Sequence, residues 1–417
     1  MTVTPKIEMA RYGAKAAAAD SGVLPTPFPR TIGPNALMYL QEVVDSGLTV
    51  DMTDRFEQAF ARAMGVAHCI ATSGCTPSLH ALVLASAWEP GDEVIVSPIT
   101  DYGTVQGLIA QGIIPVFPDT EPGSINFSAR TIQPHLTDRT RAIFCVHKTG
   151  LMVDMDPLLE LAARRGIPVY EDVCQAIFSV YKGRTAGTLG HAAAFSFDPE
   201  KTMGSDVGGC VITNDDALAE RIRFVGQARG GQMRPGFGRV HTVAGYAYRM
   251  PQCTAAICLA QLEIIREQVA HIDAMIRLQT DLLRQIPGIR PLAIPEYQDV
   301  YSCWMAGISL EPEAFNCSAG EFAAQLAEAG LPGAGLGKYY LMPAALECLR
   351  ERADEQRYPY SMPPASRRFS YRGEDLPNAW GFLETFIRWS TFCAKYQPDD
   401  CRRAAEIVRK VAERNRR

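Results

Sequence analysis

Residues 141–172 read RAIFCVHKTGLMVDMDPLLELAARRGIPVYED. The apolar run RAIFCVH predicts a buried strand, the stretch Leu158–Arg165 predicts a helix, and GIPVYED predicts a second strand. Two strands joined through a helix pair in parallel, with the helix packed on one face of the sheet. This stretch therefore predicts an α/β fold built on a mostly parallel sheet.

The same alternation of apolar runs and helical stretches continues on both sides. Ligands of such sheets collect at the carboxyl ends of the strands, so the residues that follow each strand are the candidates for a site. Together with the two strands above, five further runs give a seven-stranded sheet: AHCIATSG (67–74), DEVIVSPI (92–99), GIIPVFPD (112–119), AAAFSF (192–197) and GGCVIT (208–213). Helices are expected at Asn35–Met64, Leu79–Ala87, Val105–Gln111 and Ala217–Gln227.

The pattern divides the chain into three parts. Residues 1–34 carry three closely spaced prolines at positions 25, 27 and 29 and little periodicity, which predicts an N-terminal arm. Residues 35–275 form the large domain and residues 276–417 a smaller C-terminal α+β domain, with one long helix over Thr254–Arg284 bridging them. In the smaller domain we expect a strand at SCWMAGISL (302–310), helices at Gly320–Ala329 and Asp399–Glu413, and a long loop over Glu351–Glu374.

Composition excludes several classes of protein. The 417 residues are 47% apolar and 21% charged with a net charge of −5, so the chain is globular and lacks the basic excess of a nucleic-acid binder. No apolar run is long enough to span a membrane, and the N-terminus lacks the layout of a signal peptide. The twelve cysteines form no CxxC pair, so we expect no metal site and a reduced, cytoplasmic protein.

Residues that could bind a ligand or take part in a reaction lie at or just after the ends of three predicted strands. Ser73–Thr76 precedes a helix and predicts either a phosphate site or a plain capping turn. Asp172 ends a strand and suits either a cationic ring nitrogen or the N-cap of the next segment. Lys201 follows a strand in a short turn, where a buried lysine could form a Schiff base and a surface lysine would do nothing. A phosphate cradle, a carboxylate and a Schiff-base lysine together are what pyridoxal phosphate requires.

With these residues in place, the chain resembles the DegT/DnrJ/EryC1/StrS family of PLP-dependent sugar aminotransferases, which have fold type I. The resemblance covers about Cys69–Ile264. It rests on blocks such as CTPSLHALVL (75–84), GIPVYEDVCQA (166–176), YKGRTAGTLGHAAAFSFDPEK (181–201) and AGYAYRMPQCTAAICLAQLE (244–263).

The resemblance implies a role for each matched residue. Lys201 would bind pyridoxal 5'-phosphate as a Schiff base, Asp172 would pair with the pyridine nitrogen, and Gln175 would contact the ring hydroxyl. His147, in the block VHKTG where the family has VHLYG, would line the site or support it. The phosphate would be held by Thr76, the backbone of Cys75 and Ser196.

The chain departs from the family pattern in three places. Asp101 stands where the family has an aromatic residue that stacks on the cofactor, so either Tyr102 or a non-aromatic face covers the ring. Ala247 replaces an Asn that reaches the partner subunit's cofactor phosphate, and Asp206 lies one step before the family's acidic residue. These departures point to an unusual substrate or a specialised branch.

The activity implied is transfer of an amino group from glutamate or glutamine to a keto sugar, nucleotide-linked, or to a cyclitol, in sugar or antibiotic biosynthesis. Lys201 would act as general base and acid. Alternatives are another PLP-dependent reaction such as dehydration, although dehydratases of the family commonly replace the lysine, and a non-catalytic regulator. The resemblance also implies a homodimer with active sites at the subunit interface.

Two further groups of residues remain open at the level of sequence. Tyr339 and Tyr340 could line a sugar pocket or belong to the core. Three arginines could meet a diphosphate or a carboxylate, or form a solvated basic loop: Arg229, Arg234 and Arg239.

Overall fold

The structure is a computed structural model that describes residues 24–227, 232–241, 244–331, 333–363, 365 and 368–417. Its larger part is built on one seven-stranded sheet in the order β1-β9-β8-β5-β4-β2-β3. The strands are β1 (His68–Thr72), β2 (Glu93–Val96), β3 (Ile114–Val116), β4 (Thr140–Val146), β5 (Val169–Asp172), β8 (Ala192–Ser196) and β9 (Gly209–Thr213). All seven lie where the apolar runs predict them.

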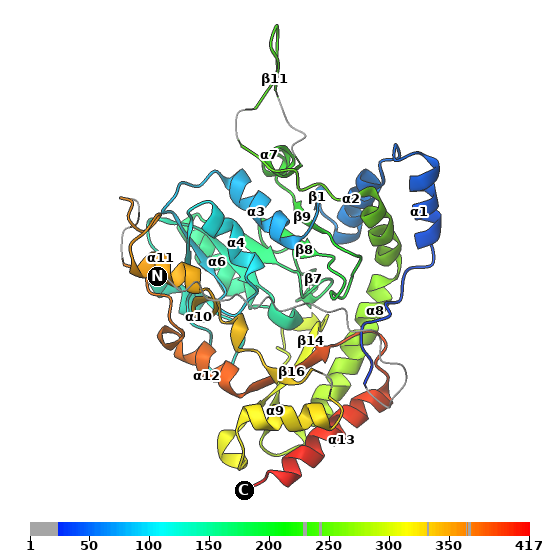
Figure 1. The fold of residues 1–417 in the computed structure, drawn as a ribbon, viewed down its shortest axis with the longest axis vertical. Helices are drawn as coiled ribbons and strands as arrows, with labels where there is room; N and C mark the ends of the chain where they lie inside the picture. Colours follow the sequence, from blue (N-terminus) through cyan, green and yellow to red (C-terminus); the bar gives the residue numbers. More distant parts are fainter. Residues whose placement is uncertain (1–23, 228–231, 242–243, 332, 364, 366–367) are drawn as a thin grey trace, which may run out of the picture.

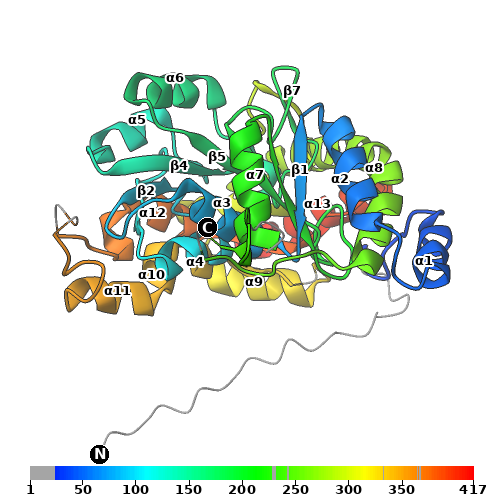
Figure 2. The same ribbon diagram turned by 90° about the horizontal axis from the view of Figure 1, so that it is seen from above.

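Strand direction matches the prediction of a mostly parallel sheet. The pairs β2/β3, β2/β4, β4/β5 and β5/β8 are parallel, and β9 runs antiparallel to both of its neighbours, β8 and β1. Helices cover both faces, and Figure 2 shows α6 and α4 on opposite sides of β4. The helices are α3 (Cys75–Ser86), α4 (Gly103–Ala110), α5 (Ala129–Ile132), α6 (Met155–Arg165) and α7 (Asp216–Gln227). Burial on both faces explains why the strands read as continuous apolar runs.

The helix expected over Asn35–Met64 is two helices, so that prediction was wrong in its continuity. α1 (Ala36–Asp45) and α2 (Met52–Met64) are separated by a turn in which Gly47 and Leu48 have φ of 62° and 68°. Left-handed backbone ends an α-helix. The side chain of Asp51 then accepts a hydrogen bond from the backbone N–H of Asp54 and starts α2.

One long helix belongs to both lobes. α8 (Gln252–Arg284) runs past α1 and α2 at one end and past α13 (Pro398–Arg414) at the other (Figure 1). Gln261 accepts a hydrogen bond from the backbone N–H of Gly33, whereas His271 bonds to the carbonyl of Tyr396. The predicted border at residues 275/276 falls inside this helix and stays a prediction.

The smaller lobe contains an antiparallel sheet in the order β12-β14-β16-β15. Its strands are β12 (Ile289–Pro291), β14 (Met305–Leu310), β15 (Gly335–Leu336) and β16 (Phe386–Thr391). α9 (Ala319–Glu328) and α13 lie where helices were expected. The predicted α+β character of this lobe is therefore present.

Several elements have no counterpart in the sequence pattern. The expected loop over Glu351–Glu374 begins inside a helix, α11, and its last residues enter a 3-10 turn, η5, so that prediction was wrong at both ends. The remaining elements are η1 (Gln133–His135), η2 (Lys148–Gly150), β6 (Val180–Tyr181), β7 (Arg184–Thr185), β10 (Gln232–Arg234), β11 (Gly238–Val240), β13 (Gln298–Val300), η3 (Pro312–Ala314), η4 (Lys338–Tyr340), α10 (Met342–Ala345), α11 (Glu347–Asp354), η5 (Gly373–Asp375) and α12 (Pro377–Thr385).

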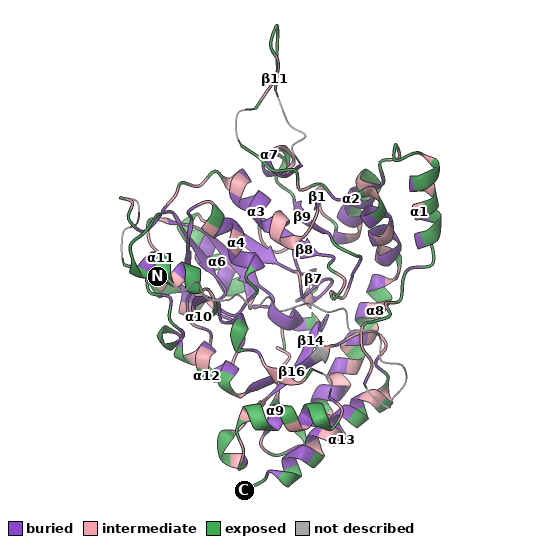
Figure 3. Cartoon of the chain, in the orientation of Figure 1, coloured by how far each residue is buried: buried purple, intermediate pink, exposed green. Residues whose placement is uncertain are grey.

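Burial follows this arrangement. Figure 3 shows buried residues along the strands of the large sheet, and exposed residues on α1 and on the projecting hairpin β10–β11. Within the described ranges, no helix has the length and apolar character needed to cross a lipid bilayer.

Candidate active site

The carboxyl ends of parallel strands bring the candidate residues to one edge of the large sheet. Asp172 is the last residue of β5 and Ser196 the last of β8, and these two strands are neighbours. β4, which ends at Val146, lies on the other side of β5. The turn after β8 carries Lys201, whose backbone N–H bonds to the carbonyl of Asp198. The strand-end rule therefore places these candidates at a single site.

Asp172 is buried and its carboxylate is held by neighbours on both oxygens. Thr104 Oγ1 donates a hydrogen bond of 2.8 Å to Oδ2, and the backbone N–H of Cys174 donates one of 3.1 Å to Oδ1. Thr104 comes from α4, the helix that follows the Asp101 segment, and was not among the predicted site residues. These contacts fix the direction of the carboxylate.

Two cysteine thiols lie beside this carboxylate. The Sγ of Cys75 is 4.0 Å from Asp172 Oδ1, and the thiols of Cys75 and Cys174 lie with that carboxylate within 4.8 Å of one another. The contact with Cys174, burial, and the nearby charge of Asp172 raise the pKa of the Cys75 thiol well above its ordinary value. A raised pKa favours the protonated form of the Cys75 thiol.

Lys201 lies against Trp304, a residue of the smaller lobe. Its Nζ is 4.1 Å from the centroid of the indole ring, and the Trp304 Nε1–H donates to the carbonyl of Glu200. Burial lowers the pKa of Lys201, but the thiols and carboxylates around it act in the opposite direction and the net pKa is raised. These groups are Cys174, Cys75, Asp198 and Asp172.

Arg30, in the segment predicted as a featureless arm, clamps the lysine turn. Its guanidinium donates to the carbonyls of Pro199 at 3.2 and 2.7 Å, of Lys201 at 2.5 Å and of Thr202 at 3.1 Å. A planar guanidinium with five donors suits such a cluster of carbonyl oxygens. The sequence carried no signal for this contact, because a lone arginine between prolines has no partner within its own segment.

The start of α3 leaves backbone donors without a cap. Gly74 is its N-cap residue and offers no side chain, and Cys75 and Thr76 are its first two residues. A side-chain Cβ on Gly209 would lie 2.5 Å from the carbonyl carbon of Gly74 and 2.7 Å from the nitrogen of Cys75. β9 therefore approaches this helix start as closely as only glycine permits. Small residues around uncapped N–H groups form a cradle for an anion.

Gln175 contacts the turn after β4. Its Oε1 accepts a hydrogen bond of 2.7 Å from the backbone N–H of Thr149, which has φ of 60°. A β-branched residue in left-handed backbone is strained, and such strain concentrates at functional sites. This contact sets the orientation of the Gln175 amide and leaves its amino group available.

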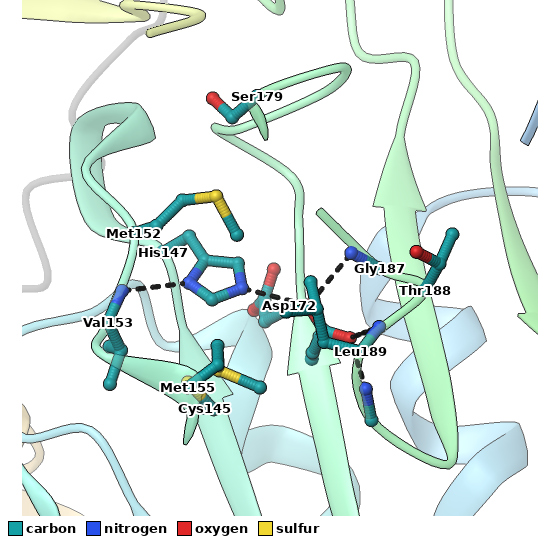
Figure 4. Close-up of polar contacts among 12 residues, drawn as sticks. Cys145, His147, Met152, Val153, Met155, Asp172, Ser179, Gly187, Thr188 and Leu189 are labelled. Atoms are coloured by element: carbon teal, nitrogen blue, oxygen red, sulfur yellow. Dashed lines mark hydrogen bonds and ion pairs between the residues drawn. The ribbon is translucent and has the colours of Figure 1, made fainter. Parts of the chain in front are cut away.

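His147 supports the site from behind. The backbone N–H of Val153 donates to His147 Nδ1 at 3.3 Å (Figure 4). The ring proton therefore resides on Nε2, which lies 3.0 Å from Glu171 Oε2. Glu171 also accepts from the backbone N–H groups of Gly187, Leu189 and Gly190. Because successive side chains of a strand point to opposite faces, this network lies on the other face from Asp172. Of the two roles left open for His147, the supporting one fits these bonds.

The departures from the family pattern are only partly explained. The Tyr102 side chain is 57% exposed, so this chain does not fold it over Asp172 and Lys201 as one reading expected. Asp101 is exposed at the start of α4, where its Oδ1 lies 3.4 Å from the backbone nitrogen of Gly103. Asp206 accepts a hydrogen bond from Thr254, and Ala247 is exposed.

The tyrosines and the arginines whose roles the sequence left open lie in different parts of the molecule. Tyr340 is buried and Tyr339 half-exposed, with their ring centroids 3.9 Å apart. Arg234 and Arg239 are exposed on the hairpin β10–β11, which projects from the body of the chain (Figure 1). Arg229 lies outside the described residues.

Comparison with known proteins settles the family. The DegT/DnrJ/EryC1/StrS aminotransferase family matches residues 31–379. The chain belongs to this family. The match reaches from Thr31 through the smaller lobe to α12, which is more of the chain than the resemblance in sequence blocks covered.

Relatives within the DegT/DnrJ/EryC1/StrS family include GDP-perosamine synthase of Caulobacter vibrioides, which is 40% identical over 53% of this chain and 59% of its own length. The spore coat polysaccharide biosynthesis protein SpsC of Bacillus subtilis is 31% identical over 64% of this chain and 70% of its own. The chain thus spans about three-fifths of the perosamine synthase. The crystal structure of 3-amino-5-hydroxybenzoic acid synthase superimposes with a TM-score of 0.80 at 25% identity, covering 94% of this chain and all of the other.

Pyridoxal phosphate fits the residues that the family site brings together. A buried carboxylate, Asp172, stands ready for a cationic ring nitrogen, and Lys201 lies close enough for their charges to interact. The uncapped start of α3 and the hydroxyl of Ser196 would supply donors for a phosphate. Among the predicted residues, Asp101 and Tyr102 are the exposed ones, and their roles stay predictions.

Proposed function

We propose that this chain is a pyridoxal-phosphate-dependent aminotransferase. It moves an amino group from glutamate or glutamine to a keto sugar, nucleotide-linked, or to a cyclitol. The carrying observation is the convergence of Asp172, fixed by Thr104, with Lys201, fixed by Arg30, in a member of an aminotransferase family. The name of the perosamine synthases supports a nucleotide-linked acceptor, because it describes a GDP-linked product.

The residues would divide the work as follows. The cofactor supplies an electron sink for the carbon that gains or loses a proton. Asp172 would keep the ring nitrogen protonated, because a buried carboxylate stabilises an adjacent positive charge. Lys201 would hold the aldehyde carbon of the cofactor, and its free amine would carry the proton to and from the reacting carbon. Gln175 would contact the ring hydroxyl, and Thr76, Cys75 and Ser196 the phosphate.

A homodimer in the cytoplasm is part of the proposal. The hairpin β10–β11 projects from the body and exposes Met233 and Phe237 at 74% and 73%, which suits burial against a second copy. The twelve cysteines are all free thiols, as expected in a reducing compartment.

The test is a visible absorption spectrum of the purified protein with the cofactor. We expect a band that bleaches on addition of glutamate or glutamine and returns when a nucleotide-linked keto sugar is added. Lys201→Ala should lose turnover completely. A band that ignores both donors, or amination by the Lys201→Ala protein, would overturn the proposal.

A further inference from the structure

A second lysine lies next to the candidate active site. Lys148 follows His147 at the carboxyl end of β4, in η2, and its side chain is completely buried. Its Nζ has no hydrogen-bond partner within the described part of the chain. It lies 3.2 Å from the centroid of the Tyr340 ring, which comes from the smaller lobe. The proposed reaction uses none of these groups.

Packing alone does not account for this side chain. An ammonium has three N–H donors, and a buried donor without an acceptor costs free energy. The Tyr340 ring stabilises the positive charge but satisfies none of these donors directionally. A buried cation that lacks an acceptor in the protein is suited to an acceptor supplied by a ligand.

The groups that act electrostatically on Lys148 include Lys201 and Asp172 of the candidate site. Burial lowers the pKa of Lys148 to about 7, and four other groups act on it electrostatically. Because an anion bound at Nζ stabilises the charged form, binding of an anion would be accompanied by proton uptake near neutral pH. The titratable groups that face it are Cys174, Asp101, Lys201, Asp172 and the Tyr340 hydroxyl, whose own pKa is raised by burial.

The Tyr340 ring, which covers Lys148, lies in a segment where the two lobes are hydrogen-bonded to each other. The backbone N–H of Thr100 donates to the carbonyl of Tyr340, and the N–H of Met342 donates to that of Pro98. The segment after β2, which includes Asp101, is thereby tied to the segment that carries the covering ring. The charges of Lys148 and Lys201 interact, which puts the Lys148 amine within range of a charged group on a substrate at Lys201.

We propose that Lys148 is a substrate-binding residue that receives a carboxylate attached at or near the reacting carbon. The inference rests on the proposed aminotransferase function and names a recognition group for it. A single buried ammonium matches a singly charged planar group better than a diphosphate, which needs several donors. The carboxylate belongs either to the amino donor and its 2-oxo acid or to an acidic sugar.

The experiment measures binding by calorimetry to the protein loaded with pyridoxal phosphate, a form that does not transaminate 2-oxo acids. One arm compares 2-oxoglutarate with its dimethyl ester, and the other compares glucuronate with glucose. We expect Lys148→Met to weaken the binding of either 2-oxoglutarate or glucuronate at least tenfold. The binding of the dimethyl ester and of glucose should not change. The wild-type dissociation constant should rise towards tenfold per pH unit above about 7, as the lysine loses its proton, and Lys148→Met should lose this dependence.

Lys338→Met is the matched control, because Lys338 is exposed in the same segment as Tyr340 and pairs with Glu384. Lys338→Met should leave the dissociation constants of all four ligands, and their pH dependence, unchanged. Lys148→Met should not lower the melting temperature, because it removes an unsatisfied buried donor. Equal carboxylate affinities in wild type and Lys148→Met would overturn the inference, as would an altered cofactor spectrum without any ligand effect. Failure of the proposed function is distinct, since the wild type would then aminate no keto sugar.

Discussion

The contacts of Asp172 fix the orientation of its carboxylate. Its two oxygens receive hydrogen bonds from Thr104 and from the backbone of Cys174, while a raised pKa favours the protonated form of the Cys75 thiol. The carboxylate is thus oriented by uncharged hydrogen-bond donors. A carboxylate held in this way can stabilise a positive charge on a ring nitrogen.

Thr104→Val should lower kcat about tenfold, because it removes the 2.8 Å hydrogen bond to Asp172 and keeps the shape of the side chain. A hydrogen bond to a charged group contributes about 1.5–3 kcal/mol, which limits the loss to about 100-fold. Steady-state kinetics with glutamate checks this result. Thr49→Val is the control, because Thr49 donates to the backbone carbonyl of Ser46 at an exposed position away from the site. An unchanged kcat in Thr104→Val would contradict the role of this contact.

At the scale of single residues, sequence analysis identified some residues of the candidate site and missed others, for a physical reason. Asp172 is the last residue of β5, and Gln175 and Lys201 lie in the segments that follow β5 and β8, so chain position alone indicates their location. Thr104, Trp304 and Arg30 reach the site through tertiary contacts from α4, the smaller lobe and the arm. No local pattern encodes a partner so far away along the chain. Tyr102 was a candidate by proximity to Asp101, and its exposure shows that adjacency in sequence does not fix direction.

Among the elements, the arm before α1 has the most specific contact with the site. Arg30 makes four hydrogen bonds to three carbonyls of the turn that carries Lys201. A turn without regular structure depends on such contacts to hold its backbone in one conformation. The segment around Arg30 is therefore a structural component of the site.

Arg30→Met should loosen the lysine turn and raise the dissociation rate of the cofactor about tenfold, with a smaller effect on the melting temperature. The reason is that four donors are lost while the aliphatic volume is kept. Release of the cofactor into an excess of a scavenging apoenzyme provides the rate. Arg402→Met, which removes an exposed ion pair with Asp399, should leave the rate unchanged. The same rate in Arg30→Met and wild type would contradict the clamp.

Element boundaries show where sequence patterns lose information. All seven strands of the large sheet could be predicted because burial on both faces leaves uninterrupted apolar runs. The break between α1 and α2 could not, because Leu48 in left-handed backbone lies outside what helical periodicity detects. β6, β7 and the hairpin are too short to generate a recognisable alternation.

At the scale of the whole molecule, the hairpin β10–β11 is unexplained within one chain. It carries Met233 and Phe237 into solvent, although isolated two-stranded ribbons are marginal in water. A partner surface would remove this apolar area from water. The hairpin is therefore the first place to test the proposed dimer.

Met233→Asp combined with Phe237→Asp should raise the dimer dissociation constant at least about 100-fold, since buried apolar anchors dominate interfaces. Sedimentation velocity over a range of protein concentrations gives this constant. Arg239→Gln, an exposed change on the same hairpin, should have little effect. A wild-type monomer, or a dimer that both acidic substitutions leave intact, would contradict the proposed interface.

The Arg30 clamp also sets an order of events during synthesis. Its contacts join residues 169 to 172 positions apart, so the arm leaves the ribosome long before its acceptors exist. Closing a loop of that length must wait for β8 and the turn behind it to be made. The first described segment to be translated is thus among the last to dock. A nascent chain has an interval in which the lysine turn is present and the arm is still free.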